Sequence, residues 1–272
     1  MKDEECVRLL QWLLPRLQMR WDGFRKIRSR VCKRLQRHIF SLHLDSVAAY
    51  QTYLIDHPEE WCKLDDICQV TISRFNRDKM VFALLADAVL PVLCQQALQQ
   101  GRQEIKIWSA GCASGEEPYT LVLLWRFYLE QQFPQLQLNI LATDTKNDLL
   151  KRAKVGCYPF SSVRNLPLDW RETAFSKTDE TYCLQSDYQQ GVHFQQHDIR
   201  QAVPSHGFDL ILCRNLAFTY YDEVLQTHVA QQLIGALRPD GALVLGIHEY
   251  LPVQYPEMEL WSKRLSIYRK HH

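Results

Sequence analysis

The residues best suited to chemistry gather in the stretch from Ile105 to Tyr119, IKIWSAGCASGEEPY. Gly111 and Gly115 bracket a run of small residues, and Glu116 and Glu117 follow directly. Glycines let a backbone approach a ligand closely, and carboxylates suit the positive end of a helix. The same carboxylates would repel a phosphate. The pattern therefore favours a cationic, phosphate-free nucleoside such as S-adenosylmethionine, although an ordinary strand-to-helix turn could also contain these residues.

Asp144 supplies a second signal for a nucleoside site, because it ends the apolar run 138–143, LNILAT. An acidic residue at the tip of the second strand of a Rossmann-like sheet is placed to bind ribose hydroxyls. The spacing from Gly115 to Asp144 leaves room for one helix and a turn. Asp144 could instead cap a helix over 146–154, or do both.

A parallel sheet is needed to position these residues, and the chain alternates apolar strands with helices after residue 104. The expected strands are 105–108, 138–143, 208–215 and 242–247, with 262–270 as the last. Residues 208–215 are continuously apolar, as expected of a parallel strand covered on both faces, and 242–247 is another buried strand. The expected helices begin near Glu116, Lys146 and Asp222. The fold class is therefore α/β with a Rossmann-like sheet over 104–272.

The segment 157–207 interrupts this alternation and reads as an insert. Within it, 182–184 and 192–194 are short apolar runs separated by a polar loop with Gly191, which predicts an antiparallel β-hairpin. His193, His197 and His206 also lie here, but their spacing fits no zinc pattern, so no metal is expected.

The first part of the chain, 1–98, reads as an all-α N-terminal domain joined by the polar linker 99–103. Residues 20–38 contain eight Lys or Arg and one Asp, with apolar residues at helical spacing on the opposite face. This basic face is either a solvated surface or a docking surface for an acidic partner. Nucleic acid is disfavoured, because few aromatic side chains lie among the charges.

Composition bounds the class of protein. The 272 residues suit one large or two small domains, and a net charge of +1 argues against a general polyanion binder. The nine cysteines include no C-x-x-C pair and suggest reduced thiols in a cytoplasmic protein. The acidic N-terminus does not resemble a signal peptide, and no apolar run is expected to span a membrane.

Several motifs in order resemble those of the CheR-type chemotaxis receptor methyltransferases, which esterify protein glutamates with S-adenosylmethionine. The first motif is WSAGCASGEEPY, and the second comprises Phe208-Asp209, Cys213-Arg214-Asn215 and Tyr220-Tyr221-Asp222. Residues 73–78, SRFNRD, are similar to the family's domain-junction segment. The basic helix is similar to the receptor-facing helix, and the insert to the family's β-subdomain.

The resemblance implies a set of roles. Arg77 would be the active-site arginine, Glu117 would hold the cofactor's ammonium group and Asp144 its ribose. Tyr220 would face the methionine end, although Tyr221 is an alternative because the preceding loop is one residue longer than usual. The other residues expected to contact the cofactor are Thr71, Ser73, Ala110, Gly111, Asp198, Ile199, Arg214 and Asn215. Those expected to contact an acidic protein, such as a chemoreceptor helix, are Arg28, Arg30 and Arg34.

The implied reaction is methyl transfer to a glutamate carboxylate, which leaves S-adenosylhomocysteine. Departures from the family pattern, including Asn76 and 246–249 (GIHE), concern the substrate side more than the cofactor side. Two other functions therefore remain open: methylation of a small-molecule carboxylate or other acceptor, and a silent module that binds S-adenosylmethionine. The sequence does not indicate an oligomeric state.

Overall fold

The computed structural model describes residues 2–271, and contacts along the chain divide it into two compact units. The helical unit comprises Met1–Thr71 and Thr219–Gln226, and the sheet unit comprises Ile72–Phe218 and Thr227–His272. The division falls after Thr71 and not at the expected linker 99–103. The reason is that the helix before this linker packs into the core beside the sheet, as described below.

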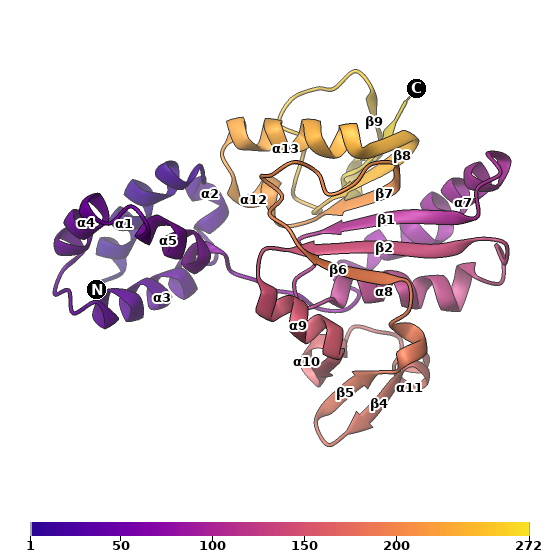
Figure 1. Cartoon of the computed structure of the whole chain (residues 1–272), viewed down its shortest axis with the longest axis horizontal. Coiled ribbons are helices and arrows are strands. Elements are labelled where there is room, and N and C mark those ends of the chain that lie inside the picture. The colour runs from indigo at the N-terminus through magenta and orange to yellow at the C-terminus, as the bar shows by residue number, and fades with distance from the viewer. Residues whose placement is uncertain (1, 272) are drawn as a thin grey trace. The chain divides into compact units, whose positions relative to one another are not determined.

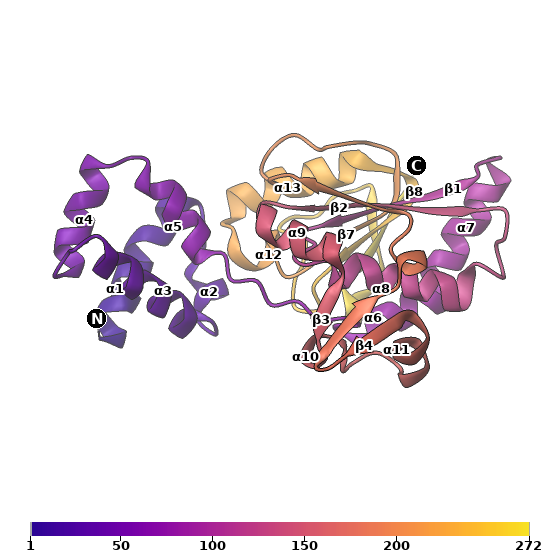
Figure 2. The same cartoon turned by 60° about the horizontal axis from the view of Figure 1, so that its bottom comes forward.

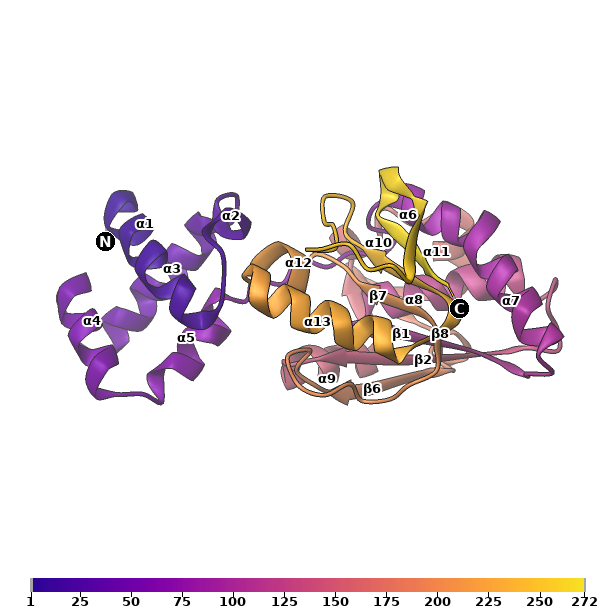
Figure 3. The ribbon, with the colours of Figure 1, turned by 90° about the horizontal axis from the view of Figure 1, so that it is seen from above.

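Apolar residues at helical spacing build the helical unit, whose helices gather around one another in Figure 3. Leu9, Leu10 and Leu13 of the first helix and Val31 and Leu35 of the third are fully buried. The helices are α1 (Asp3–Leu13), η1 (Leu14–Leu17), α2 (Trp21–Phe24), α3 (Arg28–Ser41), α4 (Val47–Asp56) and α5 (Glu60–Cys68).

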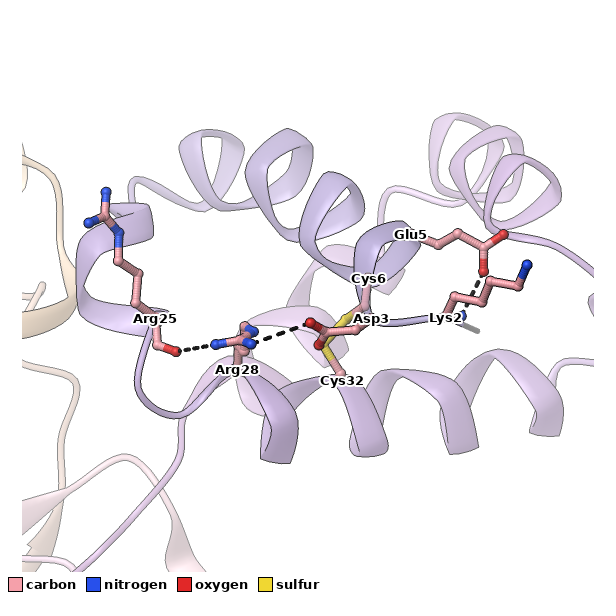
Figure 4. The surroundings of a disulfide bond; sticks show 7 residues. All are labelled: Lys2, Asp3, Glu5, Cys6, Arg25, Arg28 and Cys32. Carbon is pink, nitrogen blue, oxygen red and sulfur yellow. Dashed lines mark hydrogen bonds and ion pairs between the residues drawn. A yellow bond between two sulfur atoms is a disulfide. The ribbon is translucent and has the colours of Figure 1, made fainter.

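Disulfides correct the prediction that the cysteines are reduced thiols. Cys6 of α1 is bonded to Cys32 of α3, with their Cα atoms 5.9 Å apart (Figure 4). Cys157 is bonded to Cys183, its partner on a neighbouring strand. Each pair is 26 residues apart in sequence, so only tertiary packing brings its members together. Cys62, Cys68, Cys94, Cys112 and Cys213 are not part of a disulfide.

The segment Thr219–Gln226 completes the helical unit from the far end of the sequence. Met19 and Tyr221 form an antiparallel bridge, and Asp222 N donates to Gln18 O at 2.8 Å. Gly23 makes this close approach possible. A Cβ atom built there would lie 2.2 Å from Thr219 O, so any side chain would push the segment away.

Seven strands form the central sheet of the other unit, in the order β6-β2-β1-β7-β8-β10-β9 (Figure 1). The first five run parallel, and β10 and β9 are antiparallel to their neighbours. The strands are β1 (Glu104–Ala110), β2 (Gln137–Asp144), β6 (Val192–Gln196), β7 (Phe208–Cys213), β8 (Leu237–Leu245), β9 (Met258–Ser262) and β10 (Ile267–Lys270). The stretch expected as one last strand, 262–270, is thus the end of β9 followed by β10.

Helices cover both faces of this sheet, and Figures 1 and 2 show α8 and α13 on opposite sides of the strands. This arrangement explains why every residue of β7 is buried. The helices and turns are α6 (Lys79–Leu84), η2 (Leu85–Val89), α7 (Leu90–Gln99), α8 (Glu116–Leu124), η3 (Trp125–Leu129), α9 (Asn147–Val155), α10 (Phe160–Val163), α11 (Leu168–Ala174), η4 (Ser186–Tyr188), α12 (Ala217–Tyr220), α13 (Glu223–Ala236) and η5 (Lys263–Leu265).

The helix Lys79–Gln99 passes a length and hydropathy test for a membrane span, contrary to the expectation that no apolar run would. Its residues Val81, Leu85, Val89 and Leu93 nevertheless pack into the core against the sheet. Core helices of soluble proteins pass the same test, so the finding is weak evidence for a membrane. A π-turn, η2, precedes Pro91 and adjusts the backbone for a residue that cannot donate.

The insert forms a three-stranded antiparallel sheet, β3-β5-β4, which lies below the large sheet in Figure 1. Its strands are β3 (Cys157–Pro159), β4 (Phe175–Thr178) and β5 (Thr181–Leu184). The predicted hairpin of 182–184 with 192–194 is therefore wrong. β5 pairs with β4 across a turn with Asp179 at φ 52°, and Val192–Gln196 joins the large sheet beside β2.

Candidate active site

The carboxyl ends of β1, β2 and β7 meet at one edge of the sheet. Strand β1 pairs with β2 on one side and with β7 on the other, with Ser109 opposite both Ala142 and Leu212. The chain order reverses here, and such switch points bind ligands in open α/β sheets. Ala110, Asp144 and Arg214, which all lie at these strand ends, therefore share one edge.

The loop after β1 folds back tightly on the end of β2. Gly111 N and Cys112 N both donate to Thr143 O, at 2.8 and 2.9 Å. Gly111 has φ 81°, and a Cβ atom there would lie 2.6 Å from Leu216 Cδ2. The loop thus needs glycine both for its backbone conformation and for space, as the sequence motif suggests.

Asp144 organises this loop as well as the helix that follows it. Its Oδ2 accepts from Ala113 N at 2.9 Å, and its Oδ1 accepts from Lys146 N at 3.0 Å. Burial raises the pKa of Asp144, and these backbone donors oppose the rise. Each carboxylate oxygen can accept a further hydrogen bond, so both of the roles considered for Asp144 are chemically compatible.

Glu117 lies in a charged network that the sequence did not reveal. Its Oε1 accepts from Ser109 Oγ at 2.8 Å, and its Oε2 lies 3.0 Å from Arg214 Nη1. Arg214 Nη2 also lies 2.6 Å from Asp78 Oδ2. The guanidinium of Arg214 is therefore held between two carboxylates. Its Nε is buried and forms no hydrogen bond within residues 2–271.

Arg77 is held by neutral groups only. Its Nη1 donates to Ile72 O at 2.7 Å, and its Nη2 donates to Asn215 Oδ1 at 3.0 Å. Its backbone carbonyl accepts from Arg214 Nη2 at 3.0 Å. The segment carrying Arg77 is tied to α8, because Asn76 N donates to Thr120 Oγ1. The structure thus brings Arg77, Asn215 and Arg214 together.

Glu116 is a buried carboxylate that was not predicted to contact the cofactor or the substrate. Burial raises its pKa, and hydrogen bonds from its own backbone, Ser73 and Ser114 oppose the rise. Glu116 O also accepts from Thr120 Oγ1 at 2.6 Å. Ser73, which was expected to contact the cofactor, therefore contacts the start of α8. The second glutamate of the motif, Glu117, is the more exposed of the two.

Asp198 pairs with a neighbour instead of presenting a free carboxylate. Arg200 Nε lies 2.9 Å from Asp198 Oδ1, and Arg200 Nη2 lies 2.6 Å from Oδ2. Burial raises the pKa of Asp198, but the contacts with Arg200 outweigh it and leave the pKa below its usual value. Ile199 beside it is buried. The pair forms over two residues, a contact that the sequence reading did not consider.

Thr71 and Tyr220 belong to the helical unit, whereas the other expected cofactor residues belong to the sheet unit. Thr71 is exposed. The ring of Tyr220 lies 5.1 Å from that of Phe24, and Tyr221 is buried beside Met19. The two tyrosines therefore have different surroundings: Tyr220 packs against an aromatic ring, and Tyr221 is buried in a backbone bridge.

The basic face of α3 contains both anchored and exposed arginines. Arg28 donates to Arg25 O and to Asp3 Oδ2 (Figure 4). Arg34 donates to Gln69 O at 3.0 Å, at the carboxyl end of α5, where a cation is stabilised. Arg30 is exposed. Two of the three arginines expected to bind substrate thus also make contacts within the unit.

The donor set fits S-adenosylmethionine. Acidic side chains (Glu117, Asp144) suit an ammonium group and ribose hydroxyls, and the buried unbonded Nε of Arg214 is a donor for a carboxylate. A loop with this acidic character is unsuited to a phosphate. Residues 2–271 contain no cluster of three or more His, Cys, Asp or Glu that could hold a metal ion.

The sheet order and the residues at this edge are suited to a methyltransferase that uses S-adenosylmethionine as methyl donor. Comparison with known families agrees, since the family described as "CheR methyltransferase, SAM binding domain" matches residues 71–265. The chain belongs to this CheR methyltransferase family.

Curated relatives carry the same designation. The chain is 33% identical over 188 residues to a chemotaxis protein methyltransferase of Listeria monocytogenes, covering 68% of each chain. It is 33% identical over 190 residues to one of Borreliella burgdorferi, covering 69% of this chain and 67% of the relative. It is 33% identical over 227 residues to chemotaxis protein methyltransferase 2 of Vibrio cholerae, covering 80% and 76%.

Proposed function

We propose that this enzyme methylates glutamate side-chain carboxylates of an acidic protein substrate of the chemoreceptor type. The names of the relatives support a substrate from chemotaxis. The proposal includes the cytoplasmic location and the docking role of the helical unit expected from the sequence. S-adenosylhomocysteine is the other product.

The observation that carries the proposal is the contrast between two neighbouring arginines. Arg214 is neutralised by Glu117 and Asp78. Arg77 forms no ion pair with any residue in 2–271, and its partners are a carbonyl and an amide oxygen. A guanidinium held in place without a carboxylate retains its charge for a substrate carboxylate, which it can bind through two parallel hydrogen bonds.

The chemistry requires orientation more than proton transfer. When bound, S-adenosylmethionine supplies an electrophilic sulfonium methyl group. A glutamate carboxylate is ionised at neutral pH, so no residue of this chain has to act as a general base. Strong attraction to the ionised substrate would not by itself increase the rate. The role assigned to Arg77 is therefore to position the carboxylate for in-line attack.

The remaining residues of the edge are assigned to the cofactor. Glu117 would share its carboxylate between Arg214 and the ammonium group, and Asp144 would accept from the ribose while keeping its backbone contacts. Ala110 and Gly111 would line the nucleoside. Ser73, Asp198, Ile199, Asn215, Thr71 and Tyr220 keep the cofactor contacts proposed from the sequence.

Exposed basic residues on α3 support an acidic partner. Arg30, Lys33, Arg34 and Arg37 follow the spacing i, i+3, i+4, i+7, so they share one helix face. All four are exposed, and buried Val31 and Leu35 occupy the opposite side. A face of one charge sign increases the association rate with a partner of the other sign.

The test is transfer of a tritiated methyl group from S-adenosylmethionine to a purified chemoreceptor signalling domain. Carboxyl methyl esters hydrolyse in alkali and release volatile methanol, whereas N-methyl and C-methyl groups do not. We expect alkali-labile label on the receptor. We expect none on a matched receptor whose methylatable glutamates are replaced by glutamine, because an amide oxygen is a poor nucleophile.

Other outcomes select the other functions. Alkali-stable label would mean a different acceptor atom. Label on a small-molecule carboxylate but not on the receptor would favour a small-molecule methyltransferase. Binding of S-adenosylhomocysteine by calorimetry, with no transfer to either, would favour a silent module.

A further inference from the structure

Glu249 is a buried carboxylate next to the candidate active site, and none of the roles above uses it. Glu249 lies four residues after Leu245, the last residue of β8. Leu245 is opposite Cys213, the last residue of β7. Glu249 is 3% exposed. A carboxylate is costly to bury unless hydrogen bonds satisfy it, so the contacts of Glu249 indicate what its burial achieves.

Glu249 Oε2 accepts hydrogen bonds from two backbone N–H groups. Asn215 N lies 2.8 Å from it and Gly246 N lies 2.6 Å from it. Glu249 N in turn donates to Gly246 O at 2.8 Å and closes a turn. The carboxylate therefore joins the loop after β8 to the loop after β7.

Gly246 shows that this site is built closely around the carboxylate. A Cβ atom at Gly246 would lie 2.6 Å from Glu249 Oε2 and 3.2 Å from Asn215 Cγ. Any side chain at Gly246 would displace one or both of these groups. The packing leaves room for Glu249 only because residue 246 is glycine.

The hydrogen bond from Asn215 N stabilises an uncommon backbone conformation. Asn215 has φ 55°, in the left-handed region that few residues adopt apart from glycine, asparagine and aspartate. In this conformation Asn215 Oδ1 accepts from Arg77 Nη2 at 3.0 Å. The contacts thus run from Glu249 through the backbone and side chain of Asn215 to the guanidinium of Arg77.

We propose that Glu249 is a positioning residue for methyl transfer, which acts by holding Asn215 in the conformation that orients Arg77. This inference rests on the role proposed above for Arg77. Glu249 does not touch the reacting atoms. Its effect on Asn215 depends on the reach of its side chain and on the oxygen Oε2, which accepts from both Asn215 N and Gly246 N.

Three substitutions at this position separate reach from charge. Glu249→Gln keeps the length and one accepting oxygen but removes the charge. Glu249→Asp keeps the charge but is one methylene too short, and Glu249→Ala removes both. Glu172→Ala, which removes an exposed carboxylate in the same unit, is the matched control.

We expect kcat for receptor methylation to fall about tenfold to a hundredfold in the Asp and Ala variants, as for a misplaced positioning group. The Gln variant and the control should stay within about threefold of wild type, a change worth less than one order of magnitude in rate. Amide hydrogen exchange at Asn215 should accelerate in the Asp and Ala variants only. A rate that follows charge, with Asp active and Gln slow, would overturn the proposal.

The Arg77→Ala variant separates failure of this inference from failure of the proposed function. On that background Glu249→Asp should lower kcat no further, because the two residues act through one contact. An equal loss on both backgrounds would overturn the positioning role. If wild type does not methylate the receptor, the proposed function fails and the positioning role of Glu249 falls with it. If Arg77→Ala is fully active, the role of Arg77 fails, and the positioning role of Glu249 falls with that role. If wild type is active and Arg77→Ala is impaired, but Glu249→Asp and Glu249→Ala are fully active, the proposed function stands and the positioning role of Glu249 fails.

Discussion

Arg214 and Glu117 form a buried ion pair, with Nη1 3.0 Å from Oε2 and side chains 3% and 15% exposed. Removing one partner of a buried pair leaves the other charge uncompensated. We therefore expect Arg214→Ala to lower the free energy of unfolding by about 3–5 kcal/mol, measured by urea denaturation. Lys151→Ala, which breaks an exposed pair with Asp148, should cost at most about 1 kcal/mol. Equal losses would mean that the Arg214 network adds little.

Asp144 offers a test of the cofactor assignment. Asp144→Ala should weaken binding of S-adenosylhomocysteine by about 1–3 kcal/mol, the usual cost of losing hydrogen bonds to a charged acceptor. Asp144→Asn keeps an oxygen for Ala113 N, so it should retain the loop and show a smaller loss. Calorimetric titration measures both variants. Unchanged affinity in Asp144→Ala would remove this residue from the ribose site.

The basic face of α3 predicts a selective effect on protein substrates. Reversing charge at Arg30, Lys33 and Arg37 should raise KM for an acidic receptor and leave affinity for S-adenosylhomocysteine unchanged. Arg28 and Arg34 are left intact, because their contacts within the helical unit would confound the result. Reversal at exposed Lys263 and Arg264 is the matched control. If the two sets behave alike, the face is merely solvated.

Glu60 predicts how the stability of the helical unit depends on pH. It is 1% exposed and contacts His38, Lys63 and Tyr50. Burial raises its pKa, but the contacts with His38 and Lys63 outweigh it, so the folded-state pKa lies below the usual 4.5. A lowered pKa stabilises the fold above the unfolded-state pKa, and this contribution is lost as pH falls through the folded-state value.

The variant Glu60→Gln should therefore be less stable than wild type at neutral pH, by about 2 kcal/mol in free energy of unfolding. The difference should shrink as pH falls below the unfolded-state pKa of glutamate, about 4.3, and through the lower folded-state pKa of Glu60. Thermal melts followed by circular dichroism across this range give the comparison. A difference that grows toward acid would reverse the assigned sign.

The disulfide between Cys6 and Cys32 predicts a dependence on reductant. Cys6→Ser should lower the free energy of unfolding by about 2–4 kcal/mol relative to oxidised wild type, and a dithiol should abolish the difference. Alkylation in denaturant without reduction should label the five cysteines outside the disulfides and spare the other four, which mass spectrometry can count. Labelling of all nine cysteines would restore the interpretation as reduced thiols.

The parallel core was predictable from the sequence because its signals are local. The apolar runs that became β1, β2 and β7, and the glycines that bend the loop after β1, each act within a few residues. The insert was not predictable in the same way. Strand β6, VHFQQ, carries little apolar pattern, and its partner β2 is far away in sequence. The turn at Asp179 contains no glycine to mark it.

The site residues also divide into those marked by local sequence motifs and those whose contacts are long-range. Arg214 and Asn215 are adjacent in one motif at a strand end, and the structure brings Arg77 into contact with both of them. Asp78 and Ser109 were missed as partners of Arg214 and Glu117, since ion pairs and hydrogen bonds over long separations leave no periodic trace. Glu249 lay in a segment noted only for departing from the family pattern, and its contact with Asn215 needs the tertiary structure.

The return of Thr219–Gln226 to the helical unit sets an order for folding during synthesis. Arg20 Nε donates to Thr219 O across 199 residues of sequence. Chains emerge from the ribosome N-terminus first, at about 5–20 residues per second. The helices α1 to α5 therefore leave the ribosome many seconds before the segment that completes their unit. The helical unit can therefore be completed only after residues 72–218 of the sheet unit have been synthesised.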